Sequence, residues 1–290
     1  MILPTKEQFL AALAKTDQLA PAPRILGRAL KLLHNPDSGL QEIAELIRLD
    51  SALAVDVLRC ANSAFYSRGT RVAEVDDAVQ VIGFRETIRL VSLVATHQST
   101  NRHLGSYGIA AEDFWAESLF NGLFLEAVAR QVPVVDAGEA YTAGLLRFVG
   151  RLAIDQVLQD LGGGLFWDGT TPLPEWERAN VGLTQAEVGG RLLRKWEFPE
   201  QIVLAIEAQD LTMSGNAEAT PPLVQSMHFT AQVLPAGTNL LSIDALAEAA
   251  VSGPEQHPFA LAHQLTAPSV ADLLHKAHEA FVAVRETLYR

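Results

Sequence analysis

Apolar residues recur at helical spacing along most of the chain, whereas the alternating pattern of a β-strand is scarce. The clearest case is Leu40, Ile43, Ala44 and Ile47, spaced i, i+3, i+4 and i+7 as on one buried face of a short helix. The same spacing predicts helices over Asp50–Ser63, Glu74–Gly83, Ile88–Ala95, Asp113 to just before Pro133, Ala140–Leu158, Glu175–Trp196, Pro199–Gln209, Ala245–Ala250 and Val270–Tyr289. The pattern therefore predicts an all-α protein.

Glycine and proline divide this pattern. The long stretch Ala140–Leu158 is predicted to be interrupted around Gly150, and the segment from Gly162 to Pro174 is predicted to be a loop. Its three consecutive glycines lack the Gly-Lys-Ser/Thr that a phosphate-binding loop needs, so we interpret them as a flexible connection. A second polar loop is predicted over Thr212–Pro222.

Composition adds a large core and an acidic surface to this picture. The chain has 290 residues, of which 49% are hydrophobic and 19% charged, with a formal net charge of −12. Because nucleic acids and anionic lipids attract basic surfaces, this balance argues against both as partners. A helix-turn-helix over residues 40–63 is disfavoured for the same reason, since its face is acidic or apolar.

The compartment follows from cysteine usage and from the N-terminus. A lone cysteine, Cys60, cannot form an internal disulfide, which suits a reducing environment. The first residues lack the pattern of a signal peptide, and the uncharged run Ala219–Ile243 contains prolines and polar residues that suit no membrane span. We therefore expect a cytoplasmic protein without a membrane segment.

Residues Gly144 to Leu152 read Gly-Leu-Leu-Arg-Phe-Val-Gly-Arg-Leu. They resemble the G-L-L-H-D-I-G-K-L signature of HD-superfamily phosphohydrolases, with Arg147 and Phe148 at the positions of its His and Asp. In order and spacing, further motifs between Leu19 and about Gln209 resemble the HDOD family, an HD-related output domain of bacterial signalling proteins. These motifs are Leu19–Pro23, Leu40–Ala44, Asp50–Leu53, Leu58–Tyr66, Ala78–Phe84, Trp115–Ser118, Gln185–Gly189 and Trp196–Pro199.

The resemblance implies an HDOD-like architecture in three parts. An N-terminal helical half, residues 1–108, would pack on a degenerate HD-like half, residues 109–236, and residues 237–290 would form a C-terminal helical extension. It also implies which residues occupy the positions of the metal ligands in catalytic HD proteins, here called the HD position: Glu117, Arg147, Phe148, Gln185, Ala208 and Gln209, with a last Asp expected near Thr230 or Ala231.

The chemistry of these residues argues against a metal. A guanidinium such as that of Arg147 has no lone pair to donate and stays protonated, while Phe148 offers neither a ligand nor a proton. We therefore expect no metal, no cofactor and no catalysis at the HD position. Because a buried charge is costly unless paired, Glu117 and Arg147 are predicted to converge and pair, with the cation substituting for the metal.

Other candidate residues have plain structural interpretations. His275 and His278 have the i, i+3 spacing of metal ligands but lie on a charged, solvated helix face. His228 is interpreted as a packed histidine and Cys60 as a buried small apolar residue. Three residues near a helix end form either a partner-contact patch or a structural cap, and the structural role is favoured: Asn62, Ser63 and Tyr66.

The functional expectation is a non-catalytic signalling or regulatory module that acts through contacts with another signalling protein. Two alternatives stay open. One is a metal-dependent phosphohydrolase or phosphodiesterase with a displaced site, and the other is a sensor that binds an anion or nucleotide through Arg147. Self-association is also left open.

Overall fold

The computed structural model describes residues 5–15, 22–35, 37–63, 71–100, 102–210, 220–235 and 256–288. Within these ranges no β-strand occurs, and one isolated antiparallel bridge joins Leu104 to Ile109. The predicted all-α class is confirmed. The helices are α1 Lys6–Lys15, α2 Ala22–His34, α3 Leu40–Arg48, α4 Ser51–Ala61, α5 Val75–Ile82, α6 Phe84–Thr100, the 3₁₀ helix η1 Gly105–Tyr107, α7 Ala111–Gln131, α8 Ala137–Leu145, α9 Val149–Asp160, α10 Leu173–Val181, α11 Gln185–Lys195, α12 Glu200–Glu207, α13 Pro222–Val233, α15 Pro258–Ala262 and α16 Ala267–Leu288.

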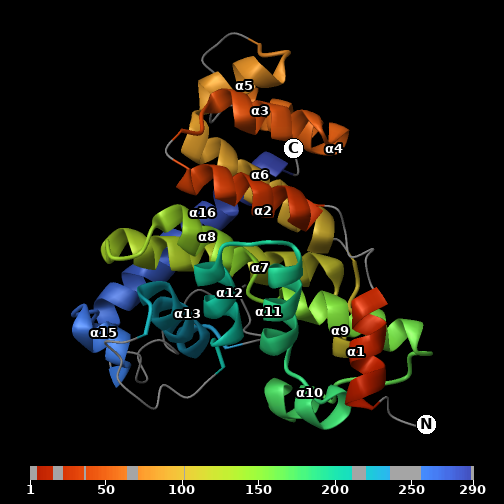
Figure 1. Ribbon diagram of the computed structural model, residues 1–290. Coiled ribbons are helices and arrows are strands. Elements are labelled where there is room, and N and C mark those ends of the chain that lie inside the picture. The colour runs from red at the N-terminus through yellow and green to blue at the C-terminus, as the bar shows by residue number, and fades with distance from the viewer. Residues whose placement is uncertain are drawn as a thin grey trace.

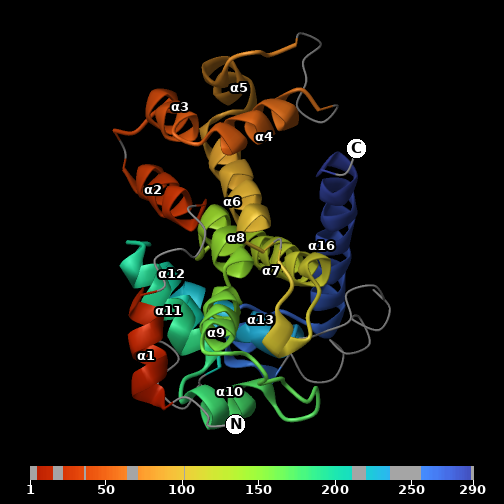
Figure 2. The ribbon, with the colours of Figure 1, turned by 90° about the vertical axis from the view of Figure 1, so that its right-hand side faces the viewer.

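The helices form two regions joined by α6, α7 and α8 (Figure 1). Helices α2 to α5 lie above α7 and α8, and α9 to α13 lie below these two helices (Figure 1). Helix α1 lies beside α9 in the lower region although it begins the chain, and α16 stands along one side (Figure 2). In the part of the chain that the structure describes, no helix combines the length and apolar character that crossing a bilayer requires.

Helix α7 lies at the centre of the fold, with α6, α8, α13 and α16 packed around it. The larger hydrophobic cluster runs from Phe9 on α1 to Met227 on α13, so it is continuous across residue 108. A smaller cluster fills the space between α7, α13, α15 and α16, and five of its members are phenylalanines: Phe120, Phe124, Phe229, Phe259 and Phe281. The division at residues 108 and 236 stays a prediction.

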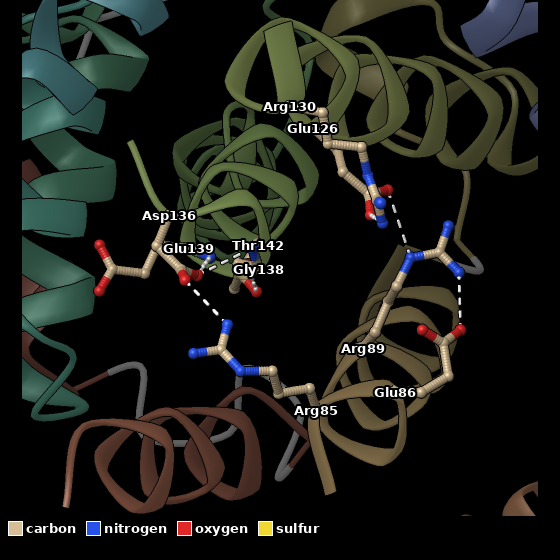
Figure 3. Close-up of polar contacts among 9 residues, drawn as sticks. All are labelled: Arg85, Glu86, Arg89, Glu126, Arg130, Asp136, Gly138, Glu139 and Thr142. Carbon is tan, nitrogen blue, oxygen red and sulfur yellow. Dashed lines mark hydrogen bonds and ion pairs between the residues drawn. The ribbon is translucent and has the colours of Figure 1, made fainter. Parts of the chain in front are cut away.

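Two arginines on α6 form ion pairs with a residue of α7 and with the residue that caps α8 (Figure 3). Arg85 donates to the carboxylate of Asp136 at 3.0 Å, and Asp136 also caps the N-terminus of α8. One turn later, Arg89 donates to Glu126 of α7 at 3.3 Å and places its guanidinium 4.7 Å from the ring centre of Tyr141 on α8. Since Glu126 is buried, this second ion pair is shielded from solvent.

Most predicted helices are present, and the structure refines two predicted stretches. The interruption placed around Gly150 lies at residues 146–148, and Gly150 itself is inside α9. The helical pattern predicted over Glu175–Trp196 forms two helices, because Gly182 adopts a φ of 77° between α10 and α11. The predicted helix Ala245–Ala250 and most of the predicted loop Thr212–Pro222 lie outside the described residues.

Candidate functional site

The turn between α8 and α9 carries two residues of the HD position into the interior. Phe148 is the N-cap residue of α9 and is 1% exposed, while the preceding Arg147 is 2% exposed. A buried guanidinium must have its donors satisfied inside the protein. The neighbours of Arg147 therefore determine what this position can do.

Arg147 is held by groups from three other segments. Its Nε donates to Oε1 of Gln209 at 3.1 Å, and its Nη1 donates to Oδ1 of Asn121 at 2.6 Å and to the carbonyl oxygen of Leu234 at 2.7 Å. Nε2 of Gln209 donates back to the carbonyl oxygen of Arg147 at 3.1 Å. Burial lowers the pKa of Arg147 to about 10, although the negative charge of Glu117 raises it, so the side chain stays cationic at neutral pH.

The cation paired with Glu117 belongs to Arg151. Nη1 of Arg151 donates to Oε2 of Glu117 at 2.9 Å, and the two side chains are 1% and 8% exposed. The predicted ion pair between Glu117 and Arg147 was therefore wrong about the partner, although the charge of Glu117 still acts on Arg147. Helix periodicity gives the reason: Glu117 and Asn121 lie one turn apart on α7, and each takes one of two arginines that are four residues apart.

Both guanidinium groups lie over the aromatic ring of Phe148. Its ring centre is 4.6 Å from Cζ of Arg147 and 3.8 Å from Cζ of Arg151. The face of an aromatic ring carries partial negative charge, and a desolvated cation over it gains about 2 kcal/mol. Phe148 therefore helps two like charges to share a dry interior.

Gln185 is brought close to this group through its backbone. It is the first residue of α11, and its carbonyl oxygen would lie 1.9 Å from a Cβ atom added to Gly150 of α9. Its side-chain Oε1 is buried and has no hydrogen-bond partner among the described residues. Ala208 ends α12 as a half-buried apolar residue and supplies no donor or acceptor side chain to the group.

Glu177 is a buried carboxyl group that sequence reasoning missed. It lies on α10 with 0% exposure, accepts a hydrogen bond from the hydroxyl of Tyr107 at 3.0 Å, and accepts one from the backbone N–H of Gln185 at 2.6 Å. Burial raises the pKa of Glu177 to about 7, against the lowering effect of these bonds and of Arg151. Nothing in the local sequence distinguishes Glu177 from the exposed Glu175 on the same helix.

The raised pKa of Glu177 predicts a specific pH dependence. Between the ordinary value of 4.5 and about 7, the folded protein keeps the Glu177 proton that the unfolded chain has released. The stability contributed by this group therefore falls by about 3 kcal/mol as pH rises through that window. Urea unfolding at pH 5, 6, 7 and 8 should show this fall in the wild type and not in Glu177→Gln, with Glu175→Gln as the exposed control. Parallel profiles for all three proteins would contradict the prediction.

The residues at the HD position do not fit a divalent metal. Glu117, the one carboxylate among them, is bonded to a guanidinium, and two fixed cations lie beside the aromatic ring of Phe148. Cation repulsion and the lack of imidazole or free carboxylate donors oppose metal binding. In the described ranges, no cluster of three or more His, Cys, Asp or Glu side chains has the geometry of a metal site.

The remaining sequence candidates lie elsewhere. Asn62 follows the last residue of α4. Its Nδ2 donates to the carbonyl oxygen of Val72, and its Oδ1 accepts from the backbone N–H of Val72, both at 2.8 Å, so the side chain has a structural role. Ser63 adjoins it, and Tyr66 lies outside the described residues. Cys60 is buried, and burial raises the pKa of its thiol.

The histidine candidates are separate from the HD position. His275 is exposed on α16 and contacts the carbonyl oxygen of Ala271, and His278 lies on the same helix. His228 on α13 contacts His257 through Nδ1 and Nε2 at 2.7 Å. Because Nδ1 of His257 accepts from the backbone N–H of Phe259, Nε2 of His257 carries the proton and donates to His228. Burial lowers the pKa of His257 to about 4.

The helical order, with Arg147 and Phe148 buried in the turn between α8 and α9, agrees with the HD-related helical domain that the sequence motifs predicted. The chain belongs to the HDOD family, because the HDOD domain model matches residues 19–211. The resemblance stated from the sequence motifs is confirmed.

Several known proteins are similar to this chain. An HDOD domain protein of unknown function from Geobacter sulfurreducens superposes with a TM-score of 0.67 at 22% identity, over 97% of this chain and 98% of that one. A protein from Marinobacter aquaeolei VT8, provisionally named a signal transduction protein, gives a TM-score of 0.67 at 20% identity, over 98% of this chain and 66% of that one. An uncharacterized protein of Treponema pallidum (strain Nichols) is 24% identical over 74% of this chain. The match covers 42% of that relative's length, so this chain corresponds to less than half of it.

A structure from Shewanella amazonensis SB2B, provisionally named a phosphohydrolase, has a TM-score of 0.64 at 21% identity and covers 97% of both chains. At these identities the similarity to the solved structures shows the fold alone. The fold is therefore shared by proteins given signalling names and by proteins given hydrolase names. The residues at the site have to decide between these functions.

Proposed function

We propose that this protein is a non-catalytic signalling module of the HDOD family that acts through contacts with other proteins. The observation that carries the proposal is the state of the HD position. Arg147, Phe148 and Arg151 fill the interior where a catalytic HD protein would need metal ligands and space for a water molecule. Family membership and a structural neighbour with a signalling name support the same direction.

The charge balance at the HD position also supports a structural role. Two guanidinium groups carry two positive charges, and Glu117 and Asp210 supply nearby negative charge. Nε and Nη1 of Arg147 donate to two side chains and one carbonyl oxygen of this chain, so these two donors are satisfied without a ligand. An interior of this kind stabilises the fold but offers no electrophile and no activated water.

The anion-sensor alternative is less well supported by these contacts. An anion would have to break the bonds from Arg147 to Asn121 and Leu234 and enter a position that is 2% exposed. The alternative of a hydrolase with a displaced metal site needs a cluster of metal ligands. Among the residues that the structure covers, no such cluster of His, Cys, Asp or Glu occurs. Both alternatives make predictions that differ from ours in one set of assays.

Metal analysis and hydrolysis assays test the proposal. We expect purified protein to hold no stoichiometric transition metal, and to turn over neither nucleotides nor cyclic dinucleotides with added Mg²⁺, Mn²⁺, Fe²⁺ or Zn²⁺. Its unfolding midpoint should not change on chelation, because two arginines stabilise the site instead of a metal. Stoichiometric metal together with turnover that a chelator abolishes would overturn the proposal. Thermal stabilisation by a nucleotide that disappears in Arg147→Met would instead support the sensor.

A further inference from the structure

A groove of about 550 Å³ runs between α2 and α3 on the upper region of the molecule. Both helices lie on the same side of α6 (Figure 2). The groove lies apart from the HD position, which is built from α7, α9, α11 and α12. Its lining residues are Arg28, Lys31 and Leu32 of α2, Glu42, Glu45 and Leu46 of α3, and Leu49 at the end of α3.

The two walls of the groove carry opposite charges. The α2 wall presents Arg28 and Lys31, and the α3 wall presents Glu42 and Glu45, all four of them exposed. Lys31 pairs with Glu197 at 2.6 Å, and the carboxylate of Glu42 accepts from the backbone N–H of Gly39. Within the described ranges, the side chains of Arg28 and Glu45 form no ion pair or hydrogen bond. One charge on each wall is therefore available to a partner.

Three leucines line the groove between its charged walls. Leu46 is 3% exposed and Leu32 is half-buried, so the floor is a leucine surface. Leu49 at the rim is 67% exposed, the largest fraction among the exposed large apolar residues in the described part of the chain. An apolar centre with a charged rim is the usual composition of a protein interface.

We propose that this groove is the contact surface of a homodimer, in which the α2 wall of each copy faces the α3 wall of the other. The charge layout favours a second copy over another partner. A partner of one charge sign would be attracted by one wall and repelled by the other, whereas a copy related by a two-fold axis meets each basic wall with an acidic wall. The same symmetry brings Leu49 of each copy to the leucine floor of the other.

Local complementarity is needed here because each copy carries a formal net charge of −12. Two such molecules repel each other at long range, so association requires a surface where opposite charges meet at close range. Arg28 facing Glu45 supplies that contact twice in a two-fold dimer. The dimer would form whether or not the HD position is catalytic.

Sedimentation equilibrium of the full chain tests the apolar part of the surface. We expect the wild type to dimerise reversibly, and Leu49→Glu to raise the dimer dissociation constant on the order of 30-fold or more. Leu261→Glu is the matched control, because Leu261 on α15 is the same residue type, is 65% exposed and does not line the groove. Circular dichroism of both variants should match the wild type.

A charge exchange tests the orientation of the two copies. Arg28→Glu alone and Glu45→Lys alone should each dimerise on the order of 10-fold more weakly than the wild type, because each homodimer would contain two contacts between like charges. An equimolar mixture of the two variants should recover association. In that mixed dimer one contact is native and the other has both charges reversed.

Three results would overturn the homodimer. The first is a wild-type chain that stays monomeric up to high micromolar concentration. The second is a dimer that Leu49→Glu and Leu261→Glu affect equally. The third is a mixture of the two charge variants that associates no better than each variant alone, which would exclude the proposed facing of α2 and α3.

Discussion

Replacing Arg151 with methionine is expected to lower the free energy of unfolding by about 3 to 5 kcal/mol. The substitution keeps much of the side-chain volume but leaves the carboxylate of Glu117, whose side chain is 8% exposed, without its 2.9 Å guanidinium partner. It also removes the cation that lies 3.8 Å from the ring centre of Phe148. Urea unfolding at pH 7, followed by circular dichroism, measures the loss.

The double variant Arg151→Met with Glu117→Gln separates the pair from the packing. Because Gln carries no charge to bury, the double variant should be more stable than Arg151→Met alone, by about 1 to 3 kcal/mol. Arg178→Met is a control, since the ion pair of Arg178 with Glu187 is long, at 3.5 Å, and exposed. That control should cost less than about 1 kcal/mol. An Arg151→Met protein as stable as the Arg178→Met protein would show that Arg151 does not stabilise the interior.

The second large effect is expected from Gly150→Ala. A Cβ atom at Gly150 would lie 1.9 Å from the carbonyl oxygen and 2.7 Å from the carbonyl carbon of Gln185. Both contacts are with backbone, so a rotamer change cannot relieve them and α9 and α11 must move apart. We expect a loss of about 3 kcal/mol or more, above the usual range for overpacking, although alanine favours a helix over glycine.

The control for Gly150→Ala is Gly39→Ala. The nearest atom to a Cβ at Gly39 is Oε2 of Glu42 at 3.5 Å, and its φ of −135° suits any residue. As an N-cap change it should cost about 1 kcal/mol or less. The same unfolding experiment compares both proteins, and equal losses would refute the tight approach of α9 to α11. A shift of α9 would also weaken the pair between Arg151 and Glu117, so the two variants should not be additive.

Local sequence was sufficient for the helices and for the class of fold. The spacing of Leu40, Ile43, Ala44 and Ile47 predicts α3, and Asp50 caps α4 with bonds to the N–H groups of Ala52 and Leu53 as expected of that residue type. Short motifs in a fixed order indicated the family, and the family model confirmed it. These features depend on residues within a few positions of one another.

The candidate site was only partly predictable. The sequence predicted that Arg147 and Phe148 stand where catalytic relatives have ligands, but it did not predict the partner of Glu117. Arg151 stands where the signature has lysine, so it was read as a match and not as a member of the site. Its position one turn after Arg147 was the available signal. Glu177 gave no signal, because its burial depends on Tyr107 and Gln185 from other segments.

The sequence by itself determined that this chain is helical and that it has the order of an HDOD protein, and it predicted that the HD position lacks metal ligands. Helical period and side-chain chemistry are properties of single residues and near neighbours, so they can be read along the chain. The tertiary structure alone decided that Glu117 pairs with Arg151, 34 residues away, and that Arg147 bonds to Gln209, 62 residues away. Which buried charges meet depends on how α7, α9 and α12 pack, because any of several partners can satisfy a buried charge.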